Sequence, residues 1–208
     1  MEEFASVRPS GLIAITLDQG DQLGWARLTS GEDEVIFVTE NGQALRFNES
    51  KVRAMGRQAA GVQAIRIANG DSVTSMDVVE KDGSLLVITS GGYGKQTPLK
   101  EYTAKGRATG GISTIDQKAL KDIGKIVAAR VVQQADDLTI ITANGVAIRI
   151  KNKDVRLAGR ATKGVHLIKP QPGDSVASVA RIAAEDLKKA GAQLNGDEKA
   201  EEAQPQLV

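Results

Sequence analysis

The sequence has no cysteine and very few aromatic residues. Its 208 residues include one Trp, two Tyr and three Phe. Without Cys the chain cannot hold a disulfide scaffold, a thiol nucleophile or a Cys-ligated zinc or iron–sulfur site. The scarcity of aromatic rings argues against an RNA-binding platform, because such platforms stack bases on Phe, Tyr and Trp.

Long hydrophobic runs are also missing. No segment approaches the roughly 20 consecutive apolar residues that span a bilayer. The first residues, MEEF, carry two acids where a secretory signal needs a basic start. We therefore expect a cytoplasmic protein that does not enter a membrane.

Glycine, in contrast, is abundant, and much of it follows an internal repeat. The chain has 22 Gly, and Gly-Arg pairs recur about 50 residues apart. These pairs are Gly56-Arg57, Gly106-Arg107 and Gly159-Arg160. Each lies in a segment of similar sequence that starts at Val35, Leu85 or Leu138, and a half-copy containing Gly11 comes before them. The chain thus holds three full repeats preceded by half a repeat.

Each repeat has the pattern of short β-strands. An apolar run is followed by a turn such as Asn41-Gly42, which supplies the positive φ of a tight hairpin, and then by an alternating strand. A second hairpin is expected after each Gly-Arg turn, in the first repeat from Val62–Ile67 to Val73–Val79. In the second repeat, Asp116–Ile123 predicts a short helical insertion in place of that turn.

Repeats of this kind predict an all-β, propeller-like array. We expect about three and a half blades of ~50 residues over residues 1–182. Residues 183–208 contain six acids and three Lys and lack a β-branched run until the last residue. This composition predicts a flexible, polar and acidic C-terminal tail.

The formal net charge of +1 conceals a segregation of charge along the repeats. Residues 44–66, 94–115 and 147–169 hold five, four and seven basic residues, with one acid in each. The intervening residues 18–40 have six acids and one Arg, and residues 71–82 have four acids and one Lys. Equivalent positions recur around one rim of a radial array. The basic halves therefore predict a positive track suited to a polyanion such as DNA.

Signals for catalysis or metal binding are weak. Tyr93 falls in a hairpin turn and Tyr102 just after a strand, and neither has the Arg and acidic context that DNA cleavage requires. His166 is the one histidine and has no partner for a metal site or triad. The string GKQT at 94–97 fails as a nucleotide-binding loop, because Ser or Thr must follow the Lys. We expect no catalytic residue and no metal ligand here.

The repeated motifs resemble a known family. The segments GLIAITLDQGDQL, TENGQALRF and GGYGKQTPLKEY, with the recurring Gly-Arg-x-x-x-Gly, are similar to the C-terminal domain of the DNA gyrase A subunit. The topoisomerase IV A subunit shares this domain in looser form. The resemblance covers residues 4–182 of this chain, which correspond to the later blades of the family domain. It implies a β-pinwheel, whose blades exchange strands, and a non-catalytic module that wraps DNA and supports supercoiling.

The resemblance also implies site residues and partners. The basic positions expected to contact double-stranded DNA are Arg46, Arg57, Lys95, Arg107, Arg149, Lys151, Arg160 and Lys163. Gln96 stands where the other repeats have Arg46 and Arg149, which predicts a weaker second blade unless Lys95 compensates. The expected partners are the gyrase B subunit, together with the N-terminal region of the gyrase A polypeptide. No cofactor is implied for this chain, since ATP and Mg²⁺ are used by other parts of the enzyme.

Two departures from the family pattern leave alternatives open. The family carries a Gln-Arg-Arg-Gly-Gly-Arg-Gly box in an early blade, and that string is absent here. The family domain also has five or six blades. Gyrase and topoisomerase IV therefore both remain open, as does a fragment or a stand-alone paralogue. The alternative function is a propeller-like scaffold whose positive rim docks an acidic protein.

Overall fold

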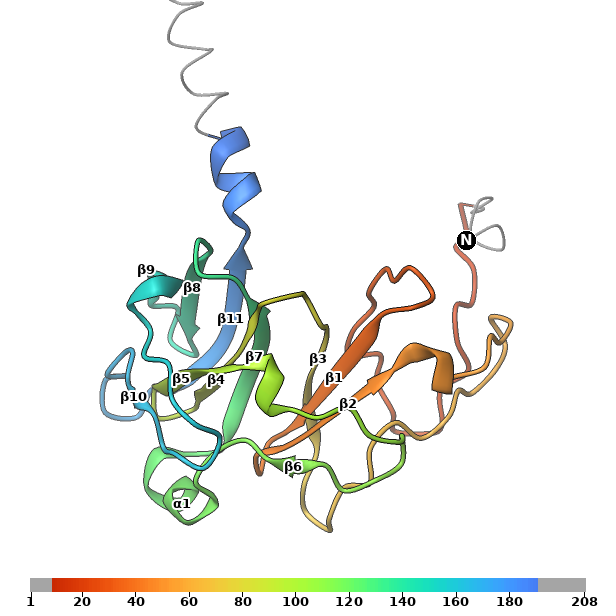
Figure 1. The fold of residues 1–208 in the computed structure, drawn as a ribbon, viewed down its shortest axis with the longest axis horizontal. Helices are drawn as coiled ribbons and strands as arrows, with labels where there is room; N and C mark the ends of the chain where they lie inside the picture. The colour runs from red at the N-terminus through yellow and green to blue at the C-terminus, as the bar shows by residue number, and fades with distance from the viewer. Residues whose placement is uncertain (1–8, 191–208) are drawn as a thin grey trace, which may run out of the picture.

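The computed structural model describes residues 9–190, and its strands form three sheets. Figure 1 shows these sheets side by side, with β1 and β2 at one end and β8 and β9 at the other. The strands are β1 (Glu34–Thr39), β2 (Gln43–Asn48), β3 (Val73–Val78), β4 (Ser84–Thr89), β5 (Tyr93–Pro98), β6 (Ile112–Ser113), β7 (Ile126–Val132), β8 (Asp137–Thr142), β9 (Ala147–Lys151), β10 (Val165–His166) and β11 (Val176–Ile182).

Short helical turns connect these strands. The 3₁₀ turns are η2 (Glu49–Lys51), η3 (Leu99–Glu101), η4 (Gln117–Ala119) and η5 (Asn152–Asp154), and α1 is Leu120–Ile123. The helical insertion expected over 116–123 is therefore confirmed. Residues 184–190 are also helical, and they continue directly from β11 (Figure 1). The remainder of the expected tail, 191–208, lies outside the described residues. Within residues 9–190 no helix has the length and apolar character needed to cross a membrane.

The predicted hairpins β1–β2, β4–β5 and β8–β9 are present in the same register. Val38 pairs with Ala44, Ile88 with Gly94 and Ile141 with Ala147. The turn glycines Gly42, Gly92 and Gly145 have φ values of +81°, +80° and +86°. Because only glycine adopts these angles without strain, the turn chemistry fixes each hairpin locally.

The outer strand of a blade comes from the following repeat. The first sheet has the order β3-β1-β2-β6 and the second β10-β5-β4-β7. We call these blades 1 and 2, and the three-stranded sheet β11-β8-β9 blade 3. The short strand β6 belongs to the second repeat but pairs with β2 of the first, and β10 likewise reaches back to β5. The strand exchange implied by the family resemblance is thus observed.

The expected second hairpin does not form. In the first repeat, Val73–Val78 pairs with β1, whereas Val62–Ile67 makes only an isolated bridge from Ile65 to Thr109. In the second and third repeats the corresponding segments form β6 and β10, which pair with the preceding blade, and the hairpin prediction was therefore wrong. A hairpin pattern in sequence cannot distinguish a neighbouring strand of the same sheet from one donated to another sheet.

The hydrophobic core lies between blades. In the hairpin strands, alternate residues face opposite neighbours: Leu85 and Val87 pack toward blade 1, whereas Leu86 and Ile88 pack toward blade 3. Strand alternation therefore serves two interfaces at once, which explains how short Val, Ile and Leu runs build a core without many aromatics.

A polar clamp recurs at both blade interfaces. Arg46 Nη1 donates to the carbonyl oxygens of Leu99, at 2.8 Å, and Tyr102, at 3.3 Å. Gln96 occupies the equivalent position in blade 2, and its Nε2 donates to the carbonyls of Asn152, at 2.6 Å, and Val155, at 3.0 Å. Arg46 at one interface and Gln96 at the other thus both bind two backbone carbonyls of the following blade. Gln96 therefore has a structural role of its own in blade 2.

The array is an open arc within the described residues. The sheets do not close on one another, and β9 has no fourth strand beside it within residues 9–190. The expected half-blade at 9–32 contains no assigned strand. It contacts the first repeat instead, through bonds from Thr16 to the carbonyls of Gln58 and Ala59.

Gly111 directly precedes the donated strand β6 and has φ +73°, and a Cβ at this position would lie only 2.6 Å from the carbonyl oxygen of Ala44. We expect Gly111→Ala to lower the free energy of unfolding by about 1–3 kcal/mol through backbone strain and this clash. Gly110→Ala is the control, because Gly110 has open space around it. Chemical denaturation measures both variants, and equal stabilities would contradict the exchange geometry.

Arg46 and Arg149 occupy equivalent positions, and each pairs with a carboxylate, Glu34 or Asp137. Only Arg46 also bonds to the carbonyls of a following blade. We expect Arg46→Ala to cost about 2 kcal/mol more of unfolding free energy than Arg149→Ala, because buried carbonyls lose a charged donor. Urea titration of both variants tests this, and similar losses would show that the clamp contributes little.

Candidate nucleic-acid interface

Three connectors, which run from the second hairpin strand to the segment after the Gly-Arg turn, each carry two or three exposed basic residues. We call residues 49–60, 99–110 and 152–163 connectors 1, 2 and 3. Their exposed cations are Lys51, Arg53, Lys100, Lys105, Lys153, Arg156 and Lys163. Because connectors 2 and 3 lead to β6 and β10 on the preceding blade, strand exchange carries their cations to the edge of that blade.

The Gly-Arg arginines make the same backbone contact in every repeat. Arg57, Arg107 and Arg160 each donate from Nη1 to the preceding repeat, to the carbonyls of Ile13, Gln63 and Ser113 at 3.1, 3.2 and 3.1 Å. In each case the acceptor lies two residues after a glycine of the preceding repeat, which is Gly11, Gly61 or Gly111. These arginines are half-buried and tie one repeat to the next.

This structural role was missed from the sequence, although the regular spacing between each Arg and its acceptor was a signal for it. The carbonyl bond uses one N–H group of each guanidinium. A guanidinium has five N–H groups in a planar fork. Arg160 uses Nη1 for the Ser113 carbonyl, and its position in connector 3 places it among surface cations.

Lys95 differs from the other predicted contacts because its side chain is fully buried. Nζ donates to the carbonyls of Gly159, at 2.5 Å, and Arg160, at 2.6 Å, and to Thr162 Oγ1 at 3.1 Å. Burial lowers the pKa of Lys95 to about 8. A buried ammonium that is bound by three oxygens cannot also contact a phosphate. The prediction of Lys95 as a direct DNA contact is therefore wrong in this structure.

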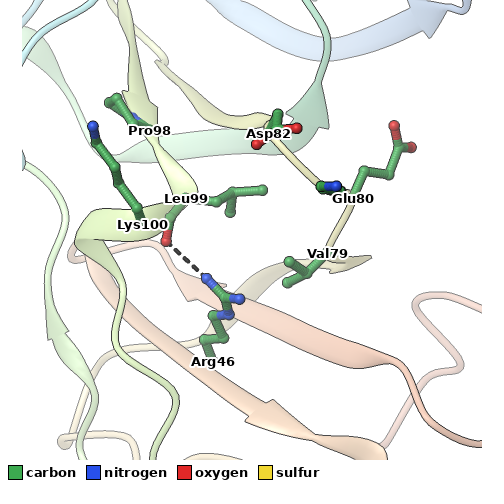
Figure 2. A pocket seen from close by; sticks show the side chains of 9 residues that line it. Arg46, Val79, Glu80, Asp82, Pro98, Leu99 and Lys100 are labelled. Carbon is green, nitrogen blue, oxygen red and sulfur yellow. Dashed lines mark hydrogen bonds between the residues drawn. The ribbon is translucent and has the colours of Figure 1, made fainter.

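Arg46 also points into the molecule. Figure 2 shows its guanidinium beneath the carbonyl of Leu99. Arg46 also lines a hollow of about 410 Å³. That hollow is also lined by Glu80, Asp82 and Lys100, so its charge is mixed. Arg46 forms an ion pair with Glu34 as well. Its bonds are those of a blade clamp, and the structure does not place it with the exposed cations.

The structure brings other predicted residues together at the third repeat. Arg149, Lys151, Lys153 and His166 line an open hollow of about 580 Å³, with Asp154 as its one acid. Lys153 was not singled out from the sequence. Lys153 lies in η5, and the fold places it in one hollow with His166 of β10, far from it in sequence.

An aromatic pair lies beside these cations. Tyr93 and His166 have ring centroids 3.9 Å apart, and Lys163 Nζ lies 5.9 Å from the centre of the Tyr93 ring. Tyr102 is buried, its hydroxyl bonds to Thr114, and burial raises its pKa. Both tyrosines therefore have packing roles. Within residues 9–190 no group of His, Asp and Glu side chains is arranged to hold a metal ion.

A family comparison matches the three repeats. The model of the DNA gyrase C-terminal domain, beta-propeller, matches residues 33–80, 83–133 and 136–183. Each matched segment contains one hairpin and the strand that completes the repeat, β3, β7 or β11.

Two relatives show the extent of the similarity. The DNA gyrase A subunit of Mycolicibacterium smegmatis is 42% identical over 188 residues, which is 89% of this chain and 22% of that protein. The Escherichia coli K12 protein of the same name is 40% identical over 183 residues, 88% of this chain and 21% of that protein. The chain thus spans about a fifth of the curated relatives it matches.

Two solved structures share the fold. The C-terminal domain of DNA topoisomerase IV superposes with a TM-score of 0.84 at 31% identity, over 94% of this chain and 61% of that one. The DNA gyrase A C-terminal domain gives 0.78 at 25% identity, over 84% and 59%. The recurring hairpins, the exchanged strands and the sequence match agree, and the chain belongs to the DNA gyrase C-terminal domain family.

Proposed function

We propose that this chain is a non-catalytic module that binds double-stranded DNA along its basic connectors. The observation that carries the proposal is the repetition of one basic turn on successive blades. Each Gly-Arg turn is held against the preceding repeat by the same carbonyl bond. Every connector carries at least two exposed cations, although their positions within the connector differ from repeat to repeat.

Such a surface suits the DNA backbone better than a base sequence. Lys and Arg that neutralise phosphates release counterions, and this gain does not depend on the base pairs. An arc with cations at each blade favours bent over straight DNA, because a bend lets one duplex contact several blades. The exposed members of the predicted set, Arg149, Lys151 and Lys163, are accordingly proposed as phosphate contacts, with Lys153 added from the structure.

The half-buried arginines of the Gly-Arg turns keep a second role in this proposal. Arg57, Arg107 and Arg160 orient the connectors and add positive potential beside the exposed lysines. Lys95 and Arg46 act inside the blade interfaces. Binding by this chain requires neither ATP nor Mg²⁺ in this proposal, so chelation with EDTA should leave DNA affinity unchanged.

The place of the module in a larger enzyme is also a proposal. The relatives are gyrase A proteins, of which this chain matches about a fifth. We infer that it supports supercoiling by wrapping DNA beside a gyrase B subunit, next to the N-terminal region of a gyrase A polypeptide. A scaffold for an acidic protein is not favoured, because the family match is to a gyrase domain.

We expect DNA affinity to fall steeply with salt, with log K dropping by about 0.9 per phosphate contact per log unit of salt. Fluorescence anisotropy with a labelled duplex measures this slope. Replacing Lys105, Lys151 and Lys163 together by Glu should lower the affinity at least tenfold, because three exposed cations are lost. Two unrelated duplex sequences should bind alike.

A control variant replaces Lys81, Lys188 and Lys189 by Glu. It changes the net charge by the same amount, on an acidic turn and in the terminal helical segment. Equal losses in both variants would show a diffuse charge effect, and salt-insensitive binding would refute the proposal. Relaxing circular DNA with the chain bound then tests wrapping, since a linking-number change of constant sign requires a handed path.

A further inference from the structure

The ammonium group of the buried Lys95 donates hydrogen bonds to three oxygen atoms of connector 3. We propose that Lys95 is a positioning residue that holds the connector-3 turn, residues 159–163, in the orientation that presents Arg160 and Lys163 to DNA. This inference rests on the proposed function, which supplies DNA as the ligand. The hydrogen bonds between Lys95 and connector 3 do not depend on that function.

The bonds of Lys95 converge on one turn. Its ammonium binds the carbonyls of Gly159 and Arg160 and the hydroxyl of Thr162. On the same strand β5, Thr97 Oγ1 donates to the carbonyl of Ala158 at 2.9 Å. Three successive carbonyls of connector 3, those of residues 158–160, are thereby bound by side chains of blade 2, which fixes the direction of the peptide planes leading into the turn.

Packing alone does not require a charge at this position. The equivalent residues in the other hairpins are Leu45 and Ile148, and Leu45 is buried like Lys95. The fold therefore accepts an aliphatic side chain there. An ammonium is costly to bury, and here its compensation comes from the turn oxygens, with no carboxylate in hydrogen-bonding contact among the described residues.

The surroundings of Lys95 explain how its charge can respond to pH. Burial is the largest influence and lowers its pKa from 10.5 to about 8. The charges of Glu101 and Asp116 oppose this shift, and that of Arg160 adds to it. Lys163, on the same turn, lies with Nζ above the Tyr93 ring.

Deprotonation removes one of the bonds that hold the turn. A neutral amine has two N–H groups, whereas the three oxygen atoms around Nζ all accept from the ammonium. Above about pH 8 the turn therefore loses a donor and a nearby positive charge. DNA affinity should fall as the pH rises through this range.

Folding stability should move in the opposite direction. The folded state has the lowered pKa, so between pH 8 and 10.5 the unfolded chain binds more protons than the folded one. The contribution of Lys95 to unfolding free energy therefore rises with pH in this window. A fall in DNA affinity over the same window cannot then be explained by unfolding at Lys95.

The test compares the full chain with Lys95→Met, and with Lys95→Leu as a second variant that copies the residue type found at Leu45. Anisotropy with a labelled duplex is measured from pH 7 to 9 at fixed salt. We expect the wild-type affinity to fall about fivefold over this range, and both variants to bind about fivefold more weakly at pH 7 with no such step. The salt slope at pH 7 should fall by about 1–2.

Lys105→Met is the matched control, because Lys105 is an exposed lysine of connector 2. It should lower the salt slope by about 1 and keep the pH step. Thermal unfolding confirms that each variant folds. If a folded Lys95 variant keeps the wild-type affinity and pH step, Lys95 does not position the turn.

A second readout needs no DNA. Limited trypsin digestion should cleave after Arg160 and Lys163 faster in the Lys95 variants than in wild type, while cleavage after Lys105 and Arg107 stays unchanged. Unchanged cleavage throughout would refute the positioning role. If the wild type fails to bind DNA but the variants loosen this turn, the proposed function fails and the positioning role stands.

Discussion

The structure depends on strand donation from each repeat to the blade before it. β6 and β10 are only two residues long, yet each completes a sheet built by the preceding hairpin. Their leading glycines, Gly111 and Gly164, lie so close to the acceptor strand that a Cβ would meet a carbonyl oxygen at 2.6 and 2.5 Å. This close approach requires glycine, and it forces the connector before it to cross to the neighbouring blade.

The crossing determines where the charges lie. A connector that stayed with its own hairpin would place its cations on one blade only. Because it reaches back, Arg107 binds the carbonyls of Lys51 and Gln63, and the cations of two repeats meet at one edge. The basic surface proposed for DNA is thus a consequence of the same topology that holds the blades together.

Equivalent positions in the repeats have been adapted to different tasks. Arg46 and Gln96 clamp a following blade, whereas Arg149 is exposed and pairs with Asp137. Leu45 and Lys95 are both buried on equivalent strands, but only Lys95 binds a turn. A basic residue in a repeat is therefore not a DNA contact by virtue of its type alone, since its neighbours decide whether the charge is used inside the protein.

The sequence by itself determined the repeats, the hairpin turns, the short helical insertion and the segregation of charge, because these depend on local backbone chemistry and on spacing along the chain. It also identified Arg149, Lys151 and Lys163 as basic positions that prove to be exposed. Only the tertiary structure decided that Val62–Ile67 leaves its expected hairpin partner, that Lys95 is buried, and that Lys153 joins the exposed cations. These outcomes depend on which blade receives each strand, and a pairing between distant segments leaves no local signal in either one.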